Sequence, residues 1–418
     1  MLATNLYNRA VPCKKQIIQQ DCSIYQGTET YSIMKNSSLR ISPNGTLAIS
    51  GKTINSVLFI DDELTKKITQ PLFSLNGLPQ HIVDNLLSHQ LVEKTEIPND
   101  FKKIYCLNNK LPYYGRIEIT DACQCNCDIC YKAEIPTAQP TLDILKKRIK
   151  HLRTLGITRL EILGGEPLLR TDLPELCDFV AKENFLYTII TNGEYLSELN
   201  DKSINSLKTA SDVVISIDSF GDIHDQNRKR PGLFAKDIEG IKTLKRNGIN
   251  CSLLCTVNQN NVLGIDKLID YLRPLEVNLF IRPTIIAGAA ANNKLQNINM
   301  RDIYEKHKNN PYVFHNTVNL ADKIQESQYY GCDIRQLINI DVNGRLLVCH
   351  MDRSYKKGPI EKYTPEMLIN ELDFTLRNRL SQQETCKDCD VNTSSDGIKC
   401  GGFCQFSNTY NRNKIAER

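Results

Sequence analysis

The fold and the chemistry of this chain are indicated by nine residues, Cys123-Gln124-Cys125-Asn126-Cys127-Asp128-Ile129-Cys130-Tyr131. They follow a strand-like run, Arg116–Thr120, so they should form a loop after a strand. Cys123, Cys127 and Cys130 make a CxxxCxxC triplet. Three thiolates on one loop can hold three irons of a cubic iron–sulfur cluster and leave the fourth iron without a protein ligand. A cluster that only carries electrons normally has four protein ligands, so the triplet predicts that a small molecule reacts at the open iron.

Outward from this loop, strand-like and helical patterns alternate. The strand-like runs are Arg116–Thr120, Thr158–Leu163, Leu186–Thr191, Asp212–Asp218, Asn250–Val257 and Glu276–Pro283. Helical stretches separate them, and the first, Thr141–Leu155, has apolar residues at helical spacing. Six β–α repeats with short turns predict an α/β fold built on a partial (β/α)6 barrel. The cysteine loop follows the first strand and therefore lies at the C-terminal mouth, where such barrels carry their active sites.

The ends of two further strands carry groups that suit an amino acid. The second strand ends in Gly164-Gly165-Glu166-Pro167, where two glycines allow a close backbone approach and Glu166 can accept hydrogen bonds from an ammonium group. The fourth strand ends in Ser216-Ile217-Asp218, and Arg228 follows. A hydroxyl and a guanidinium together suit a carboxylate. These residues predict a site for an amino-acid-bearing ligand beside the open iron.

This combination of CxxxCxxC, GGEP and the Ser216–Arg228 stretch resembles the radical S-adenosylmethionine (SAM) superfamily, most of all its branch that modifies peptides and proteins. The resemblance implies two cofactors, a [4Fe-4S] cluster with one open iron and SAM, whose methionyl group chelates that iron. One electron from the cluster then cleaves the sulfonium, and the resulting 5′-deoxyadenosyl radical abstracts a hydrogen from the substrate. A zinc site is the alternative for the triplet alone, but GGEP at the next strand end favours the cluster.

The resemblance also assigns roles by position. It makes Cys123, Cys127 and Cys130 the cluster ligands and leaves Cys125, which is off the spacing, as a bystander. The predicted SAM-binding residues are Gly164, Gly165, Glu166 and Pro167 for the amine, Ser216 and Arg228 for the carboxylate with Asp218 beside them, and Ile129 near the adenine.

The last part of the chain is rich in cysteine: Cys332, Cys349, Cys386, Cys389, Cys400 and Cys404. The pattern is similar to the SPASM extension of the same superfamily, which holds two auxiliary iron–sulfur clusters. Two departures from that pattern are a long gap between Cys389 and Cys400 and the lack of a cysteine after Cys404. Six cysteines cannot supply eight ligands, so one auxiliary cluster has an open or non-cysteine site, or only one forms. A structural zinc ribbon is the alternative. Asp352 is the proposed base that deprotonates the substrate, and a solvated loop acid is the alternative.

The first ~105 residues carry a different pattern. Strand-like runs at Leu39–Ser42 and Thr46–Ser50 flank a hairpin signal, and a third run is Val57–Ile60. Helical stretches follow at Glu63–Phe73 and Pro79–Gln90. Three short strands and two helices predict a small winged-helix-like domain. Residues 1–115 hold 12 Lys/Arg and 9 Asp/Glu, a weak positive balance that disfavours a DNA-binding wing and favours a peptide-binding role over a structural cap.

The whole chain thus resembles maturases of ribosomally made peptides, whose front domain pairs a leader peptide with a sheet edge. The predicted domains are 1–105 for leader recognition, 106–290 for the radical SAM barrel, 291–330 for a connector and 331–418 for the auxiliary clusters. The resemblance implies a peptide-crosslinking enzyme that forms a C–C (cyclophane) or C–S (thioether) bond and takes electrons from a flavodoxin or ferredoxin. The alternatives are a maturase that forms formylglycine in sulfatases and a non-catalytic zinc-binding adaptor.

Composition supports a cytoplasmic location. Residues Met1–Ala10 lack the pattern of a signal peptide, and no run of ~20 apolar residues could span a bilayer. The net charge is +4 with both signs interspersed, so neither a nucleic acid nor an anionic membrane is an expected partner. The chain has 16 cysteines, and in a reducing compartment clustered cysteines indicate metal binding rather than disulfides.

Overall fold

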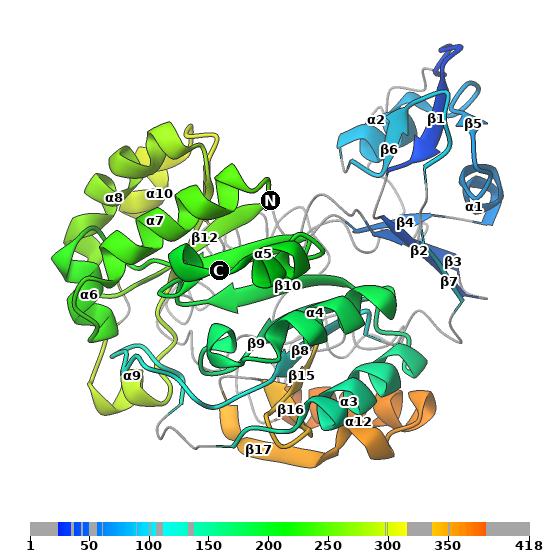
Figure 1. The fold of residues 1–418 in the computed structure, drawn as a ribbon. Coiled ribbons are helices and arrows are strands. Elements are labelled where there is room, and N and C mark those ends of the chain that lie inside the picture. The colour runs from blue at the N-terminus through cyan, green and yellow to red at the C-terminus, as the bar shows by residue number, and fades with distance from the viewer. Residues whose placement is uncertain are drawn as a thin grey trace. The chain divides into compact units, whose positions relative to one another are not determined.

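The computed structural model divides the chain into two compact units, Met1–Leu111 and Pro112–Arg418 (Figure 1). Each unit is described by itself. The structure describes residues 24–34, 37–42, 45–49, 57–60, 62–88, 90–99, 102–105, 112–132, 138–296, 298, 300–315, 337–349 and 352–381.

The described part of the N-terminal unit contains two small sheets and two helices. One sheet has the order β5-β1-β6 and is antiparallel, with β1 at Thr30–Ile33, β5 at Phe73–Ser74 and β6 at Val92–Lys94. The other has the order β4-β3-β2-β7, with β2 at Ser38–Ser42, β3 at Gly45–Ile49, β4 at Val57–Ile60 and β7 at Lys102–Tyr105. The helices are α1 (Asp62–Ile68) and α2 (Gln80–Ser88).

The three strands predicted for this unit are confirmed. β2, β3 and β4 form the four-stranded sheet with β7. A buried core joins α1 and α2 to β1, β5 and β6 and also takes in β2, through residues that include Ile33, Leu39, Ile68, Val83 and Val92. The sheet β5-β1-β6 was missed because its strands are very short and pair across more than forty residues of intervening sequence.

The second unit is built on one curved sheet with the order β14-β13-β12-β11-β10-β9-β8-β15-β16-β17. All neighbours from β14 to β15 are parallel, and the last two pairs are antiparallel. The six predicted strands are β8 (Tyr114–Glu118), β9 (Arg159–Leu163), β10 (Leu186–Thr191), β11 (Asp212–Ser216), β12 (Cys251–Val257) and β13 (Asn278–Pro283). They form the predicted partial barrel.

Four strands extend this sheet beyond the prediction. They are β14 (Val313–His315), β15 (Leu337–Ile340), β16 (Arg345–Cys349) and β17 (Asp352–Pro359). β14 pairs with β13 and β15 pairs with β8, so both edges of the six-stranded core gain a parallel neighbour. The tail is joined to the barrel by Arg148 on α3, whose Nη1 donates to the Val342 carbonyl at 2.8 Å and whose Nε donates to Glu361 at 3.0 Å.

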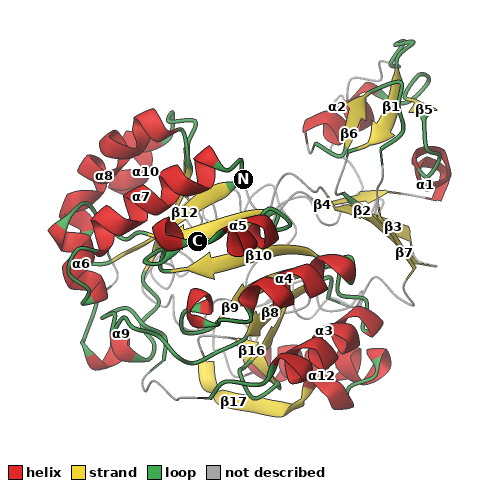
Figure 2. Cartoon of the chain, viewed as in Figure 1, coloured by secondary structure: helices red, strands yellow, loops and turns green. Residues whose placement is uncertain are grey.

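Helices cover the outer face of the barrel strands (Figure 2). They are α3 (Leu142–Thr154), α4 (Leu173–Lys182), α5 (Asp201–Leu207), α6 (Asp222–Arg228), α7 (Leu233–Arg246) and α8 (Ile265–Leu272). Beyond them lie α9 (Ala289–Asn292), α10 (Arg301–His307) and α12 (Pro365–Ser381), and single turns of 3₁₀ helix at Pro167–Leu169, Leu196–Glu198, Val262–Gly264, Arg273–Leu275 and Ile360–Lys362. In the described residues, no helix is long and apolar enough to span a membrane.

Alternate residues of each strand face the helices or the barrel lumen. On β8 and just after it, Ile117 and Ile119 are fully buried toward the helices, whereas Arg116 and Glu118 face the lumen and form ion pairs there. The core therefore lies between sheet and helices, and the lumen is lined by polar and half-buried side chains. The strand ends carry the loops of the candidate site to the mouth of this lumen.

Candidate functional site

The cysteine loop follows β8 and is held at several points by the ends of neighbouring elements. Gln124 Nε2 donates to Glu194 Oε2 at 2.8 Å, just beyond β10. The backbone N–H of Asp128 donates to the carbonyl of Asn227 on α6 at 3.0 Å. The Asp128 carboxylate pairs with Lys229 at 2.6 Å. These contacts fix both halves of the loop to the barrel mouth.

Four thiols share this loop, and they are not equivalent. Cys125 is buried, with 4% of its surface exposed, while Cys123, Cys127 and Cys130 are partly exposed. A hydrogen bond from the Cys125 thiol lowers the pKa of Cys123 to about 6 and also lowers the pKa of Cys127, whereas the same contacts raise the pKa of Cys125. Burial raises the pKa of Cys130. Cys125 thus keeps its proton, which agrees with its position off the motif spacing.

The donor set fits a cubic cluster. Three partly exposed thiols on one loop correspond to one sulfur for each of three irons. Arg228 Nη1 lies 3.8 Å from the Cys127 sulfur, and a cation beside a thiol favours the thiolate form that binds iron. Among the described residues, no group of three or more His, Cys, Asp or Glu side chains is arranged so that it could hold one metal ion.

The Gly164-Gly165 turn packs directly against the base of the cysteine loop. The N–H of Gly165 donates to the Thr120 carbonyl, and the N–H of Glu166 donates to the Ala122 carbonyl, both at 2.7 Å. A Cβ atom on Gly165 would lie 2.2 Å from the Ala122 oxygen, and one on Gly164 would lie 2.2 Å from the Thr120 oxygen. Only glycine fits this approach at either position.

Glu166 is fully buried and makes more internal contacts than the sequence predicts. Its Oε1 accepts from the Leu168 N–H at 2.9 Å and from Thr191 Oγ1 at 2.7 Å, and its Oε2 accepts from the Asn192 N–H at 2.7 Å. Burial raises the pKa of Glu166 to about 7. The carboxylate therefore ties the turn after β9 to the end of β10, and one of its roughly four acceptor directions is left for a ligand.

Asp218 and Arg228 form a buried ion pair beside the cysteine loop. Asp218 Oδ2 accepts from Arg228 Nε at 2.6 Å and from Asn227 Nδ2 at 2.8 Å, and its Oδ1 accepts from the Thr256 N–H at 3.1 Å. Ser216 ends β11, two residues before Asp218, and is also buried. The structure thus brings Ser216, Asp218 and Arg228 together near Cys127, and Asp218 is the residue that orients the guanidinium.

Two residues under this site were assigned no role from the sequence. His224 on α6 accepts a hydrogen bond at Nδ1 from the Asp218 N–H at 3.0 Å, so its Nε2 carries the proton and faces Asp237 Oδ2 on α7 at 3.1 Å. Burial lowers the pKa of His224 to about 3 and raises the pKa of Asp237 well above its usual range. The pair is therefore neutral. His224 belongs to the His224-Asp225 stretch after β11, but nothing local in the sequence indicates Asp237 as its partner.

This buried histidine predicts a pH dependence of stability. Because the folded pKa lies below the unfolded value of about 6.5, the contribution of His224 is fully present above pH 6.5 and is lost as pH falls toward 3, by up to ~1.4 kcal/mol per pH unit. In His224→Asn the amide oxygen can still accept from the Asp218 N–H, so this variant should lose less stability than wild type between pH 7 and pH 5. Urea titrations at pH 7 and at pH 5 would measure this change in the free energy of unfolding. The variant His81→Asn, which changes an exposed histidine, is the control. An equal change of unfolding free energy with pH in wild type and His224→Asn would contradict the assignment.

Other predicted residues are placed only in part. Ile129 is partly exposed on the cysteine loop. Cys349 ends β16 and pairs in register with Asp352 on β17, but the side chain of Asp352 lies outside the described residues. Cys332, Cys386, Cys389, Cys400 and Cys404 also lie outside them. The residue after Asp352, Arg353, packs over the Tyr131 ring with 5.1 Å to its centroid, so β17 contacts the end of the cysteine loop.

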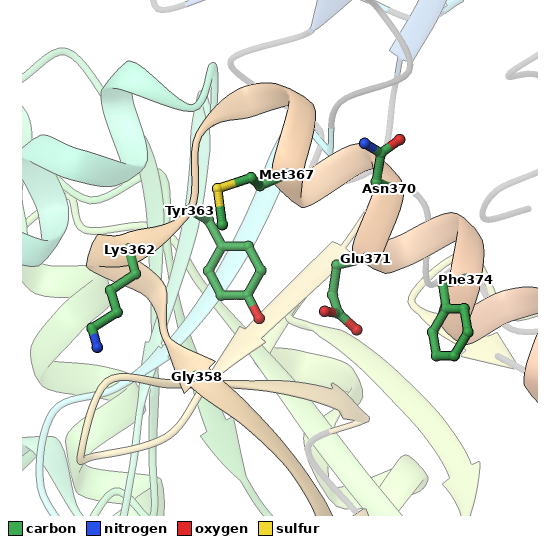
Figure 3. Close-up of a pocket in the computed structure, with 7 residues that line it drawn as sticks. All are labelled: Gly358, Lys362, Tyr363, Met367, Asn370, Glu371 and Phe374. Carbon is green, nitrogen blue, oxygen red and sulfur yellow. The ribbon is translucent and has the colours of Figure 1, made fainter.

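A pocket in the tail lies apart from the predicted residues. It is lined by Gly358, Lys362, Tyr363, Met367, Asn370, Glu371 and Phe374, from β17, the turn after it and α12 (Figure 3). Its carboxylate, Glu371, already pairs with Lys357 at 2.8 Å. No sequence-predicted site residue lines this pocket, so the chemistry is assigned to the barrel mouth.

Residues 117–272 match the family model described as the radical SAM superfamily. The chain carries a radical SAM domain. Among relatives, the antilisterial bacteriocin subtilosin biosynthesis protein AlbA of Bacillus subtilis is 30% identical over 173 residues, which cover 41% of this chain and 39% of AlbA. A GTP 3′,8-cyclase of Lactiplantibacillus plantarum is 26% identical over 51% of this chain and 67% of that enzyme. This chain therefore aligns with well under half of AlbA.

The solved structures extend the likeness beyond the radical SAM domain. The structural alignment with Streptococcus suis SuiB bound to the precursor peptide SuiA covers 90% of this chain and 96% of the SuiB chain, with a TM-score of 0.66 and 15% identity. The alignment with native anSMEcpe with bound AdoMet and a Kp18Cys peptide covers 67% of this chain and 87% of the anSMEcpe chain, with a TM-score of 0.51 and 18% identity. At these identities the likeness establishes the fold, a radical SAM partial barrel. Radical SAM proteins use a [4Fe-4S] cluster and SAM.

Proposed function

We propose that this chain is a radical SAM enzyme that abstracts a hydrogen from a ribosomally made precursor peptide and joins two of its residues by a C–C or C–S bond. The observation that carries the proposal is the set of three partly exposed thiols packed against the Gly164-Gly165 turn and the Asp218–Arg228 pair. The fold likeness to SuiB over 90% of the chain, together with the relative AlbA, favours a peptide as substrate.

The residues of the barrel mouth have distinct roles in this proposal. Cys123, Cys127 and Cys130 would hold the cluster. Gly164, Gly165, Glu166 and Pro167 would bind the methionyl amine, Ser216 and Arg228 its carboxylate, and Ile129 the adenine, with Asp218 orienting Arg228. When bound, the cluster and SAM supply a carbon radical strong enough to remove a hydrogen atom. Asp352 would take a proton from the substrate.

The flanking segments complete the proposal. Residues 1–105 would recognise the leader of the peptide by adding it as a strand to a sheet edge. Residues 291–330 would connect the barrel to the tail 331–418. The tail would hold one or two auxiliary iron–sulfur clusters, which would accept the second electron as the new bond forms. Their ligands would be Cys332, Cys349, Cys386, Cys389, Cys400 and Cys404. The enzyme would act in the cytoplasm with a flavodoxin or ferredoxin as electron donor.

Formylglycine formation in sulfatases is the second candidate. The likeness to anSMEcpe covers 67% of the chain against 90% for SuiB, and this difference favours the precursor-peptide reaction.

Co-expression of the chain with any short peptide encoded beside its gene tests the proposal. The expected product is a peptide lighter by the mass of two hydrogens, with the crosslink located by fragmentation. Co-expression with Cys127→Ala is the control and should leave the peptide unchanged. An unmodified peptide with the wild-type chain would contradict the proposal.

A further inference from the structure

The lumen of the barrel contains several arginines, and most are paired with an acid. Arg116 pairs with Glu161 at 2.6 Å, and Arg228 pairs with Asp218 at 2.6 Å. Arg353 pairs with Glu118. These guanidinium groups are therefore neutralised by the protein itself and have structural partners in the absence of any ligand.

Arg282 differs from them. It lies at the end of β13, and its Nε donates to Thr256 Oγ1 at 3.2 Å. Among the residues that the structure describes, no carboxylate lies within 4 Å of its guanidinium, and no acceptor is found for its two Nη groups. Arginine has five N–H donors and stays charged in proteins, so four donors of Arg282 are available to a ligand.

The position of Arg282 is at the mouth of the lumen, close to the proposed SAM site. Arg282 and Thr256 are partners in the β12–β13 register, and the Thr256 N–H donates to Asp218 Oδ1. Ile281, the preceding residue, is fully buried toward the helices, so Arg282 faces the lumen. Burial and the nearby Arg116 lower the pKa of Arg282, and the attraction of Glu161 and Asp218 does not cancel this effect.

The neighbouring lumen surface is apolar. The half-buried residues on the lumen side of nearby strands are Ile190, Leu254, Phe280 and Phe314. Phe280 and Phe314 stack with centroids 5.1 Å apart, and Phe280 shares its face of β13 with Arg282. An apolar wall with one unpaired guanidinium at its edge suits a peptide segment that carries a single carboxylate.

We propose that Arg282 binds a carboxylate of the peptide substrate, either an acidic side chain or the C-terminus, and thereby fixes which segment of the peptide lies against the apolar wall. The inference rests on the proposed function. The carboxylate of SAM is the other possible source of the same chemistry, but Arg228, whose Nη1 lies 3.8 Å from the Cys127 sulfur, is the candidate for that role.

The variant Arg282→Met keeps the length of the side chain and removes its charge and donors. Its kcat/KM for crosslinking the peptide encoded beside the gene should fall about 10- to 100-fold, the size expected for one charge-assisted hydrogen-bonded pair. SAM affinity and the slow release of 5′-deoxyadenosine without peptide should not change. Arg273→Met, an exposed arginine that pairs only with Asp270 at the surface, is the matched control.

Peptide variants identify the partner. Each Asp and Glu of the peptide is changed to Asn or Gln, and the C-terminus is amidated. One neutralisation should reproduce the loss with wild-type enzyme and cause no further loss with Arg282→Met, because the two changes remove the same contact.

Three outcomes would overturn the inference. The first is a wild-type kcat/KM in Arg282→Met, and the second is that the loss of kcat/KM in Arg282→Met multiplies with the loss caused by every peptide variant. The third is a loss of SAM affinity in Arg282→Met, which would assign Arg282 to the cofactor. In all three, the wild-type chain still crosslinks the peptide and the proposed function stands. A wild-type chain that leaves the peptide unmodified overturns both.

Discussion

Replacing Cys127 with alanine should abolish the release of 5′-deoxyadenosine from SAM in the presence of dithionite. Cys127 is the central thiol of the triplet, and it lies 3.8 Å from Arg228, which Asp218 holds in place. Two remaining thiols would leave two irons without protein ligands, so the cluster would be lost or would lack the single open site. The measurement combines iron content and absorbance of anaerobically purified protein with quantification of 5′-deoxyadenosine.

Cys125→Ala provides a control from the same loop. Cys125 is buried, keeps its proton and contacts Asn192 Nδ2 at 3.4 Å, so its loss should lower stability slightly and leave iron content and SAM cleavage near wild type. If Cys127→Ala retains activity while Cys125→Ala loses it, the ligand assignment is wrong. A colourless wild-type protein that contains only zinc would support the adaptor alternative instead.

The barrel could be predicted because its signals are local. Most strands from β8 to β13 are short runs rich in apolar residues that are followed by a helix, and parallel strands need such crossovers. The motifs at the strand ends then meet at one edge, because the carboxyl ends of parallel strands share that edge. In the structure, Gly165 and Arg228 contact the cysteine loop, and Ser216 ends β11.

The missed features depend on contacts between distant residues. β14 and β15 have three and four residues, and they are strands only because β13 and β8 offer free edges. Glu166 looks like a ligand-binding acid in sequence, but the fold places three donors around it. Arg282 is one of 52 Lys and Arg residues, and its distinguishing property is that none of the described carboxylates forms an ion pair with it.

Gly165→Ala should have the second largest effect, through the backbone rather than through any reacting group. A Cβ at this position would lie 2.2 Å from the Ala122 oxygen and 2.5 Å from the Asp121 oxygen. Both are backbone atoms at the base of the cysteine loop and cannot rotate away. The loop must shift, which breaks the hydrogen bonds of Gly165 and Glu166 to it and displaces the first cysteine.

The expected consequence is a loss of catalysis that exceeds the loss of stability. Overpacking of this kind costs about 1–3 kcal/mol of unfolding free energy, which a folded domain can survive. A displacement of about 1 Å at a reacting centre can cost about 100-fold in rate, so 5′-deoxyadenosine release should fall by at least that factor, with iron content reduced. Thermal unfolding, iron analysis and SAM cleavage on the same preparation separate the two effects.

Gly358→Ala is the matched control for this glycine. Gly358 lies on β17, and a Cβ there would meet no atom within 4 Å, so all three measurements should stay near wild type. If Gly165→Ala also cleaves SAM at the wild-type rate, the cysteine loop tolerates displacement and close packing of the Gly164-Gly165 turn is not what positions the cluster ligands. If SAM cleavage is lost while iron content stays at the wild-type level, the turn acts on SAM itself, as expected for a backbone that binds the methionyl amine.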